Sequence, residues 1–221
     1  MIDPRIEEYV EQLSSPHEDL LAELSAETAD VLGMTQMLTG PVAGRFLELL
    51  VWFGRPTRVL EIGTFSGHSA LAMAAALPEG GRIDACELDP ERAAFAQRYF
   101  DRSPHGSKIT LHVGPALETV NSLEGDFDLV FIDAEKEGYV GYYEAVLPRL
   151  SERGLIVADN TLANGRVVEG ARPDIADFNE HVAADPRSVQ VVLSVRDGMT
   201  LVRRAYQPVG VSLLPQRRWA S

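Results

Sequence analysis

The chain has 221 residues, of which 45% are hydrophobic and 24% are charged, an ordinary composition for one globular domain with a sizeable core. Its formal net charge of −13 disfavours nucleic acid or an anionic membrane as a partner. No apolar run is long enough for a membrane span, and no signal-peptide pattern is recognised. The single cysteine, Cys86, excludes an intrachain disulfide, so we expect a cytoplasmic protein.

Residues 1–57 are predicted to form a helical cap, because apolar side chains recur there at helical spacing. Pro41 suits a first helical turn and Gly54 suits the stop that follows Phe53. We expect these helices to lie over the top of a following sheet or against a partner subunit. The face predicted for the third helix consists of Val42, Phe46, Leu49, Leu50 and Phe53.

From residue 58 onward, strand and helix patterns alternate, which predicts right-handed crossovers and a parallel sheet. A final pair of strands meets at Arg196-Asp197-Gly198, where Asp-Gly is a strong hairpin signal. We therefore expect one domain over residues 1–221, with an α/β core at 58–204 and an irregular tail at 205–221. The predicted strands are 58–62, 82–87, 109–113, 128–132, 154–158, 189–195 and 199–204. The predicted helices of the core are 69–77, 90–100, 115–123, 138–150 and 175–184.

The segment Arg58–Leu77 joins a strand to a helix through a glycine turn, the first unit of a nucleotide-binding sheet. Its Gly63 and Gly67 do not fit the G-x-G-x-x-G spacing of dinucleotide-binding loops. Glu61, just before the first glycine, would repel a pyrophosphate but attract a positively charged ligand. S-adenosylmethionine (SAM) is such a ligand, since it carries a sulfonium and an amino group and no phosphate.

Ligands of open α/β sheets gather at the carboxyl ends of the strands, so the residues that follow each strand are the candidates. Glu87 follows the second strand, where a carboxylate commonly holds two ribose hydroxyls. Asp89 competes for that role, although Asp-Pro-Glu is also typical of a helix N-cap. The turn at 114–116 either passes beneath an adenine ring or simply connects a strand to a helix.

Three oxygen-bearing side chains, Asp133, Asp159 and Asn160, follow the fourth and fifth strands. Hard oxygen ligands suit Mg²⁺, Mn²⁺ or Ca²⁺ rather than zinc. From the sequence, each aspartate is equally well explained as a helix cap or turn former. Lys136, close to Asp133, could reach the same space as a base, or it could be an ordinary solvated lysine.

Taken together, the segments resemble the metal-dependent, SAM-using O-methyltransferases of the caffeoyl-CoA and catechol type. The resemblance covers residues 37–204. The aspartate-lysine segment combined with the aspartate-asparagine pair is specific, whereas the glycine loop alone is not. The matching stretches are Leu60–Ser69, Glu87–Asp89, Gly114–Leu117, Phe127–Lys136 with Tyr139 and Tyr142, Gly154–Leu162 and Asp197–Leu201.

The resemblance implies an α/β fold with a Rossmann-like, seven-stranded, mostly parallel sheet, helices on both faces and a C-terminal antiparallel hairpin. It implies SAM, a divalent metal (Mg²⁺ first, Mn²⁺ or Ca²⁺ as alternatives), a small aromatic diol as substrate, and a homodimer. It assigns metal binding to Asp133, Asp159 and Asn160, the role of base to Lys136, and substrate contact to Asn164. The cofactor residues it implies are Met37, Glu61, Gly63, Thr64, Ser69, Glu87, Ala116, Asp133 and Glu135.

Three departures from the family pattern bear on the substrate. His68 replaces a frequent tyrosine, Arg153 replaces a glycine, and Ala163 replaces a tryptophan that is common beside the substrate. The missing tryptophan argues against a plant-like phenylpropanoid ester. Two alternatives are kept: a metal-independent methyltransferase of the same fold that acts on another atom, and, less favoured, a nicotinamide-dependent oxidoreductase.

Overall fold

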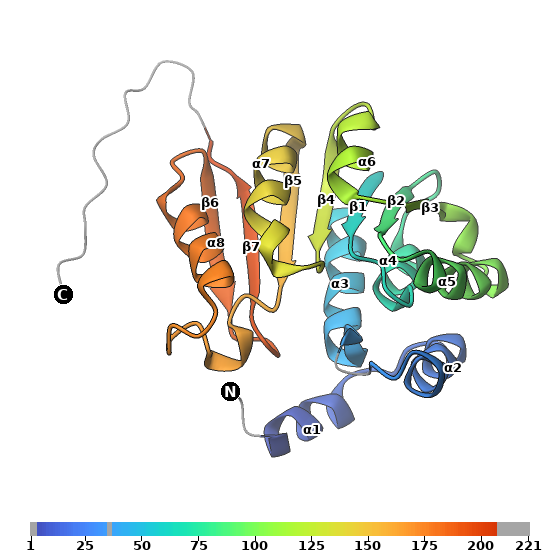
Figure 1. The fold of residues 1–221 in the computed structure, drawn as a ribbon. Coiled ribbons are helices and arrows are strands. Elements are labelled where there is room, and N and C mark those ends of the chain that lie inside the picture. The colour runs from blue at the N-terminus through green and yellow to red at the C-terminus, as the bar shows by residue number, and fades with distance from the viewer. Residues whose placement is uncertain (1–3, 35–36, 207–221) are drawn as a thin grey trace.

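The computed structural model describes residues 4–34 and 37–206, and a seven-stranded sheet lies at its centre (Figure 1). The strand order is β3-β2-β1-β4-β5-β7-β6. Strands β1 to β5 pair in parallel, and β7 pairs antiparallel with both β5 and β6, which confirms the predicted fold class and hairpin. The strands are β1 (Arg58–Ile62), β2 (Arg82–Glu87), β3 (Ile109–Val113), β4 (Phe127–Ile132), β5 (Leu150–Asp159), β6 (Ser188–Leu193) and β7 (Met199–Arg204).

Helices cover both faces of the sheet (Figure 1). On one face lie α3 (Gly40–Gly54), α4 (His68–Ala76) and α5 (Pro90–Arg102); on the other lie α6 (Ala116–Ser122), α7 (Tyr139–Val146) and α8 (Pro173–Ala184). Beyond the carboxyl ends of the strands lie α1 (Pro4–Leu13) and α2 (Asp19–Glu27), the latter continued by a π-helical turn, Thr28–Leu32. Short 3-10 turns occur at Gly106–Lys108, Lys136–Gly138, Leu147–Arg149 and Ala163–Gly165. No helix in the described ranges is both long and apolar enough to cross a membrane.

The alternation of side chains along each strand builds a core on each face of the sheet. Leu60 and Ile62 of β1 are fully buried in the core that contains α7 and α8, where the rings of Tyr139 and Tyr143 meet the edge of Phe178. Side chains on the opposite face of the sheet pack against α3 and α4. There, Val59, Leu129 and Phe131 form a core with Leu47, Val51 and Met73. Two buried faces explain why the strands are almost continuously apolar.

The predicted face of α3 is only partly buried in the single chain. Phe46 and Leu50 pack against the core, whereas Leu49 and Phe53 are 55% and 79% exposed. Close approach between α3 and α4 selects a different face, because a Cβ on Gly44 would come within 3.0 Å of both His17 and His68. The buried residues of α3 are Ala43, Gly44, Leu47 and Val51.

The boundaries of β5 and β6 also differ from the prediction. The chain leaves α7 early, and Leu150 already pairs with Phe127 before the register shifts and Leu155 pairs with Leu129. Gly154 permits this irregularity, because a Cβ there would lie 2.8 Å from the carbonyl oxygen of Phe127. Strand β6 ends at Leu193, so the hairpin connection is longer than predicted. Most of the predicted irregular tail, residues 207–221, lies outside the described residues.

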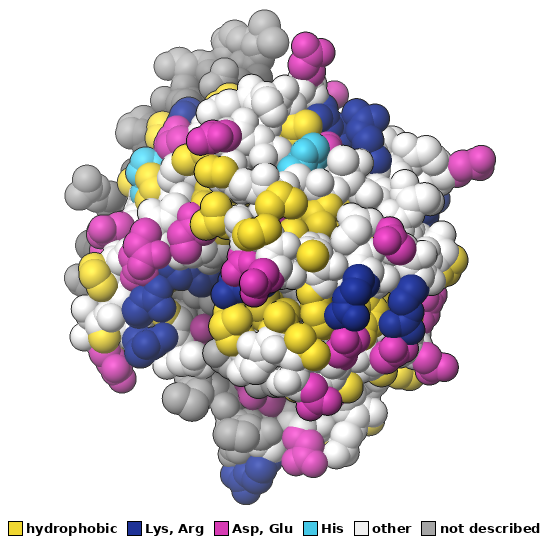
Figure 2. All heavy atoms as spheres, turned by 45° about the vertical axis from the view of Figure 1, so that its right-hand side comes forward, with side chains coloured by type: hydrophobic (Ala, Val, Ile, Leu, Met, Phe, Trp, Pro, Cys, Tyr) yellow, Lys and Arg dark blue, Asp and Glu magenta, His cyan; other side chains and the backbone are white. Residues whose placement is uncertain are grey.

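Charges of both signs are interspersed on the face drawn in Figure 2, where Lys and Arg side chains lie beside Asp and Glu side chains. Hydrophobic side chains form patches near the middle of this face. Between α5 and α2, Arg98 pairs with Glu27 at 2.9 Å and Arg102 pairs with Glu23 at 2.6 Å. Basic side chains therefore do not form a continuous surface on the face shown.

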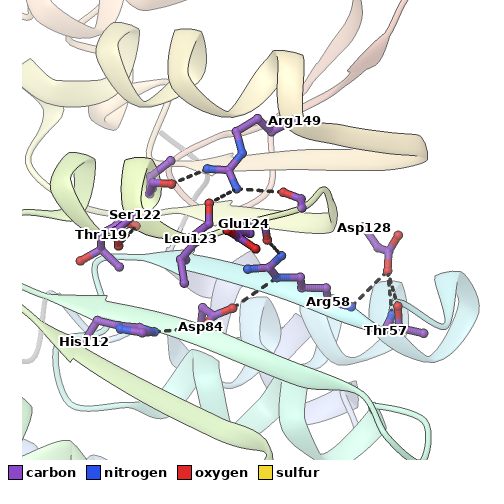
Figure 3. Close-up of polar contacts among 12 residues, drawn as sticks. Thr57, Arg58, Asp84, His112, Thr119, Ser122, Leu123, Glu124, Asp128 and Arg149 are labelled. Atoms are coloured by element: carbon purple, nitrogen blue, oxygen red, sulfur yellow. Dashed lines mark hydrogen bonds and ion pairs between the residues drawn. The ribbon is translucent and has the colours of Figure 1, made fainter.

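A polar network links neighbouring strands of the sheet (Figure 3). Asp128 accepts hydrogen bonds from the backbone and hydroxyl of Thr57, at 2.8 and 2.9 Å. Asp84 lies 3.4 Å from Nε of Arg58 and 2.9 Å from Nε2 of His112. These contacts tie β1, β2, β3 and β4 together, and we assign them to stability of the sheet.

Candidate active site

A cavity of about 630 Å³ lies at the carboxyl ends of the strands. Its wall is built from residues that follow β1, β2, β3, β4 and β5, joined by the segment Met37–Thr39 and by Arg196. The predicted site residues in this wall are Met37, Gly63, Thr64, Ser69, Glu87, Ala116, Asp133, Glu135, Lys136, Asp159 and Asn160. The sheet therefore brings together residues that are far apart in the sequence, and the ligand each one binds stays a prediction.

The turn after β1 exposes its backbone to the cavity. Gly63 has φ +95°, and a Cβ on it would lie 2.2 Å from the carbonyl oxygen of Asp133. The backbone N–H groups of Gly63 and Thr64 both donate to the carbonyl of Cys86, at 3.0 and 3.1 Å. Glycine is required here because the first and fourth strand ends approach each other too closely for a side chain.

Glu61 lies behind this turn, fully buried, and does not itself line the cavity. Burial raises the pKa of its carboxyl to about 7, and the hydroxyls of Ser69 and Thr64 only partly oppose that rise. The Ser69 and Thr64 hydroxyls lie near this carboxylate, but neither of its oxygens has a hydrogen bond of regular geometry among the described residues. The contact of Glu61 with the amino group of SAM stays a prediction.

The structure separates the roles of Glu87 and Asp89. Asp89 caps α5, since its Oδ1 accepts the backbone N–H groups of Glu91 at 2.8 Å and Arg92 at 3.3 Å. Glu87 is held in the cavity wall by the N–H of Phe65, which donates to Oε2 at 2.7 Å. Asp89 thus acts as the N-cap, whereas Glu87 lies in the cavity wall, and its contact with a ribose stays a prediction.

Lys136 is not a solvated surface lysine. Its side chain is 15% exposed, and Nζ donates to Oδ1 of Asp133 at 3.1 Å and to Oδ1 of Asn160 at 2.9 Å. The ammonium also donates to the hydroxyl of Tyr139. That hydroxyl contacts the carbonyls of Ile132 at 3.2 Å and Asp159 at 3.0 Å, which links the ends of β4 and β5.

Asp159 is the most deeply buried acid of this cluster. Its Oδ1 accepts the backbone N–H of Asn160 at 2.8 Å, whereas Oδ2 has no hydrogen-bond partner among the described residues. Burial, followed by the charge of Asp133, raises the pKa of Asp159 to about 7. Two acids, one of them with an orphaned oxygen, and an amide oxygen fit a hard divalent cation. Within residues 4–34 and 37–206, no three His, Cys, Asp or Glu side chains form a metal-binding group.

Asn164 lies apart from the other predicted residues. It is exposed and does not line the cavity, and its backbone N–H donates to Oδ1 of Asp197. Its predicted contact with substrate stays a prediction.

The sequence did not indicate the surroundings of His68 or the presence of Arg196 in the cavity wall. His68 is buried, with Nδ1 unpartnered among the described residues, and its ring meets that of His17 at 5.5 Å between centroids. Burial lowers the pKa of His68 to about 4, so the ring is neutral. Arg196 was considered only as part of a hairpin turn, and no local pattern indicates that its side chain reaches the cavity.

A sequence model of the O-methyltransferase family matches residues 11–205. The chain is 36% identical over 211 residues to a catechol O-methyltransferase of Niastella koreensis, covering 89% of this chain and 95% of that protein. It is 35% identical to a caffeoyl-CoA O-methyltransferase of Petroselinum crispum, covering 76% of this chain and 77% of that protein.

Solved structures agree with the sequence comparisons. The SAH-bound methyltransferase PaMTH1 of Podospora anserina superposes with a TM-score of 0.87 at 30% identity, covering 92% of this chain and 95% of that one. An O-methyltransferase from Bacillus cereus in complex with SAH superposes with a TM-score of 0.83 at 26% identity, covering 91% of this chain and 97% of that one. The chain belongs to the O-methyltransferase family. It is a SAM-dependent O-methyltransferase, which removes the nicotinamide-dependent alternative.

Proposed function

We propose that the chain transfers the methyl group of SAM to a hydroxyl of a small vicinal diol of the catechol type, held by a divalent metal. The observation that carries the proposal is the cluster at the cavity wall in which Lys136 lies within 3.1 Å of Asp133 and 2.9 Å of Asn160, beside the orphaned oxygen of Asp159. The similarity to a catechol O-methyltransferase and to a caffeoyl-CoA O-methyltransferase supports the diol.

Asp133, Asp159 and Asn160 would hold the metal, with Mg²⁺ as the first choice and Mn²⁺ or Ca²⁺ as alternatives. A divalent cation held by these residues would supply Lewis-acid chemistry that favours loss of the phenolic proton of a bound diol. Lys136 would accept the proton of the attacking hydroxyl. The residues of the turn after β1 hold the methyl donor in line with that oxygen, so alignment supplies much of the acceleration.

Removal of the metal tests this proposal. With SAM and caffeic acid as the probe acceptor, the protein is expected to transfer methyl groups in Mg²⁺, to stop in excess EDTA and to recover when Mg²⁺ is restored. Transfer that persists in EDTA would contradict the roles of Asp133, Asp159 and Asn160 and favour the metal-independent alternative. If no transfer occurs, calorimetry with SAM separates an unsuitable acceptor, where SAM binds, from a wrong assignment of the site, where it does not.

The remaining expectations concern partners and compartment. We propose a homodimer, supported by exposed apolar side chains on the N-terminal helices, and light scattering would reject it by giving the mass of a single chain. The net charge of −13 and the interspersed surface charges support a small-molecule substrate rather than nucleic acid or a membrane. The single, buried Cys86 supports a reducing, cytoplasmic location. The exposed apolar residues are Ile6, Tyr9, Leu13, Trp52 and Phe53.

A further inference from the structure

Arg196 is a cation of the cavity wall that the proposed chemistry does not use. It lies in the loop between β6 and β7, and its side chain is 29% exposed. Its guanidinium reaches a segment more than 150 residues earlier in the chain: Nη2 donates to the carbonyl of Leu38 at 3.0 Å, and Nη1 donates to the carbonyl of Thr39. Leu38 and Thr39 also line the cavity.

The backbone that directly follows Arg196 is held by two hydrogen bonds to a neighbouring loop. The N–H of Leu162 donates to the carbonyl of Asp197 at 2.8 Å, and the N–H of Thr161 donates to the carbonyl of Gly198 at 3.0 Å. A Cβ on Gly198 would lie 2.4 Å from Cγ of Leu162, so the two loops are in close contact. The loop is therefore fixed to the residues that directly follow Asp159 and Asn160.

The guanidinium also faces the cluster of acids. Nη1 lies 3.8 Å from Oδ2 of Asp159, the oxygen that has no hydrogen-bond partner among the described residues. One side chain thus spans from the carbonyls of Leu38 and Thr39 to the acid at the end of β5. Leu38 and Thr39 are thus held next to Asp159, one of the acids proposed to bind the metal beside the methyl acceptor.

The backbone of Arg196 is in a conformation that favours glycine, with φ +49°. Keeping an arginine there costs conformational energy, so its side-chain contacts have to offset that cost. Strained residues that survive beside a binding site are candidates for a role in that site. Arg55 has the same φ without lying in the cavity wall, so it is the side-chain contacts of Arg196, together with its φ, that make it a candidate.

We propose that Arg196 is a positioning residue that fixes the segment Leu38–Thr39 as the acceptor-side wall of the cavity, in register with Asp159. The guanidinium is suited to this task, since its planar fork donates to two neighbouring carbonyls at once. Lysine would keep the charge but not the paired hydrogen bonds. The expected effect of Arg196 on binding of the methyl acceptor rests on the proposed function, whereas its hydrogen bonds to residues 38 and 39 do not.

The test compares Arg196→Gly and Arg196→Lys with Arg55→Gly. Arg55 is the matched control, because it also has positive φ, +48°, and lies at the end of α3 outside the lining of the cavity. In Arg196→Gly, the KM for caffeic acid is expected to rise roughly tenfold, the effect of losing about one charge-assisted hydrogen bond. The values of kcat and of the KM for SAM should change much less, and Arg196→Lys should recover part of the loss. Arg55→Gly should leave all three constants unchanged.

Two readouts distinguish positioning from general stability. Arg196→Gly is expected to leave the melting temperature unchanged or raised, because it relieves the strained φ, while hydrogen exchange increases in peptides covering residues 37–43. An unchanged acceptor KM with unchanged exchange in those peptides would overturn the inference. If the wild-type protein transfers no methyl group, the proposed function fails, and exchange alone decides: faster exchange supports the hold on residues 38 and 39, and equal exchange refutes it.

Discussion

Asp159→Asn is expected to remove almost all methyl transfer while leaving the fold intact. The substitution keeps the shape of the side chain but removes one of the two carboxylates proposed to bind the metal. We expect kcat/KM to fall by more than roughly a hundredfold, since even residues that only support metal ligands commonly cost ten- to a hundredfold. Steady-state kinetics over a wide range of Mg²⁺ concentration measures the loss.

The metal-free Asp159→Asn protein should be at least as stable as the wild type, although its activity falls. The pKa of Asp159 is raised from 3.8 to about 7 in the folded protein, so its ionised form destabilises the metal-free fold increasingly as pH rises from 3.8 to 7. At pH 8 and without metal, Asp159→Asn should therefore melt no lower than the wild type. Asp101→Asn, an exposed site whose carboxylate accepts a hydrogen bond from Gln97 at 2.7 Å, is the control. An Asp159→Asn protein with near wild-type kcat/KM would refute metal binding by this residue.

Glu61→Gln is expected to weaken SAM binding and to stabilise the SAM-free protein. We expect the Kd for SAM, measured by calorimetry at pH 8, to rise roughly tenfold or more, because a charge-assisted contact with the amino group is lost. The wild-type protein should bind SAM more weakly at pH 6 than at pH 8, because Glu61 becomes protonated, and this dependence should be smaller in the variant. An unchanged Kd would place the amino group elsewhere.

The stabilisation follows from the burial of Glu61. Because its pKa is raised from 4.5 to about 7, the free energy of unfolding falls between pH 4.5 and 7 and stays low above pH 7. A shift of that size corresponds to a cost on the order of 3 kcal/mol for the ionised form, an upper limit for what Gln can recover. The SAM-free variant should therefore gain more in melting temperature at pH 8 than at pH 5. Equal gains at both pH values would contradict the effect of the charge.

The site residues that could be predicted from the sequence are those at the ends of strands and the starts of helices. The strand that ends at Ile62 and the turn at Gly63 have a local pattern, and parallel pairing then brings Asp133 and Asp159 to the same edge of the sheet. The assignment of Asp89 as a helix cap followed from Asp-Pro-Glu alone. Short-range patterns thus sufficed wherever neighbours in sequence are neighbours in space.

The parts that could not be predicted depend on contacts between distant loops. Nothing near Arg196 in the sequence indicates that it bonds to Leu38 and Thr39, and nothing near His68 indicates its contact with His17. The buried face of α3 was missed for a related reason: tight packing against α4 favoured Gly44 over the larger apolar side chains. Tertiary packing, rather than periodicity, decided these details.

The hydroxyl of Tyr139 joins the ends of β4 and β5 at the carbonyls of Ile132 and Asp159. The separation between the two acidic strand ends is consequently a property of the sheet and its underlying core, independent of the loops that surround the cavity. The loops that surround the cavity can then differ in sequence without changing that separation. The acceptor specificity of such a fold can therefore change through the loops around the cavity, while the residues at the ends of β4 and β5 keep their positions.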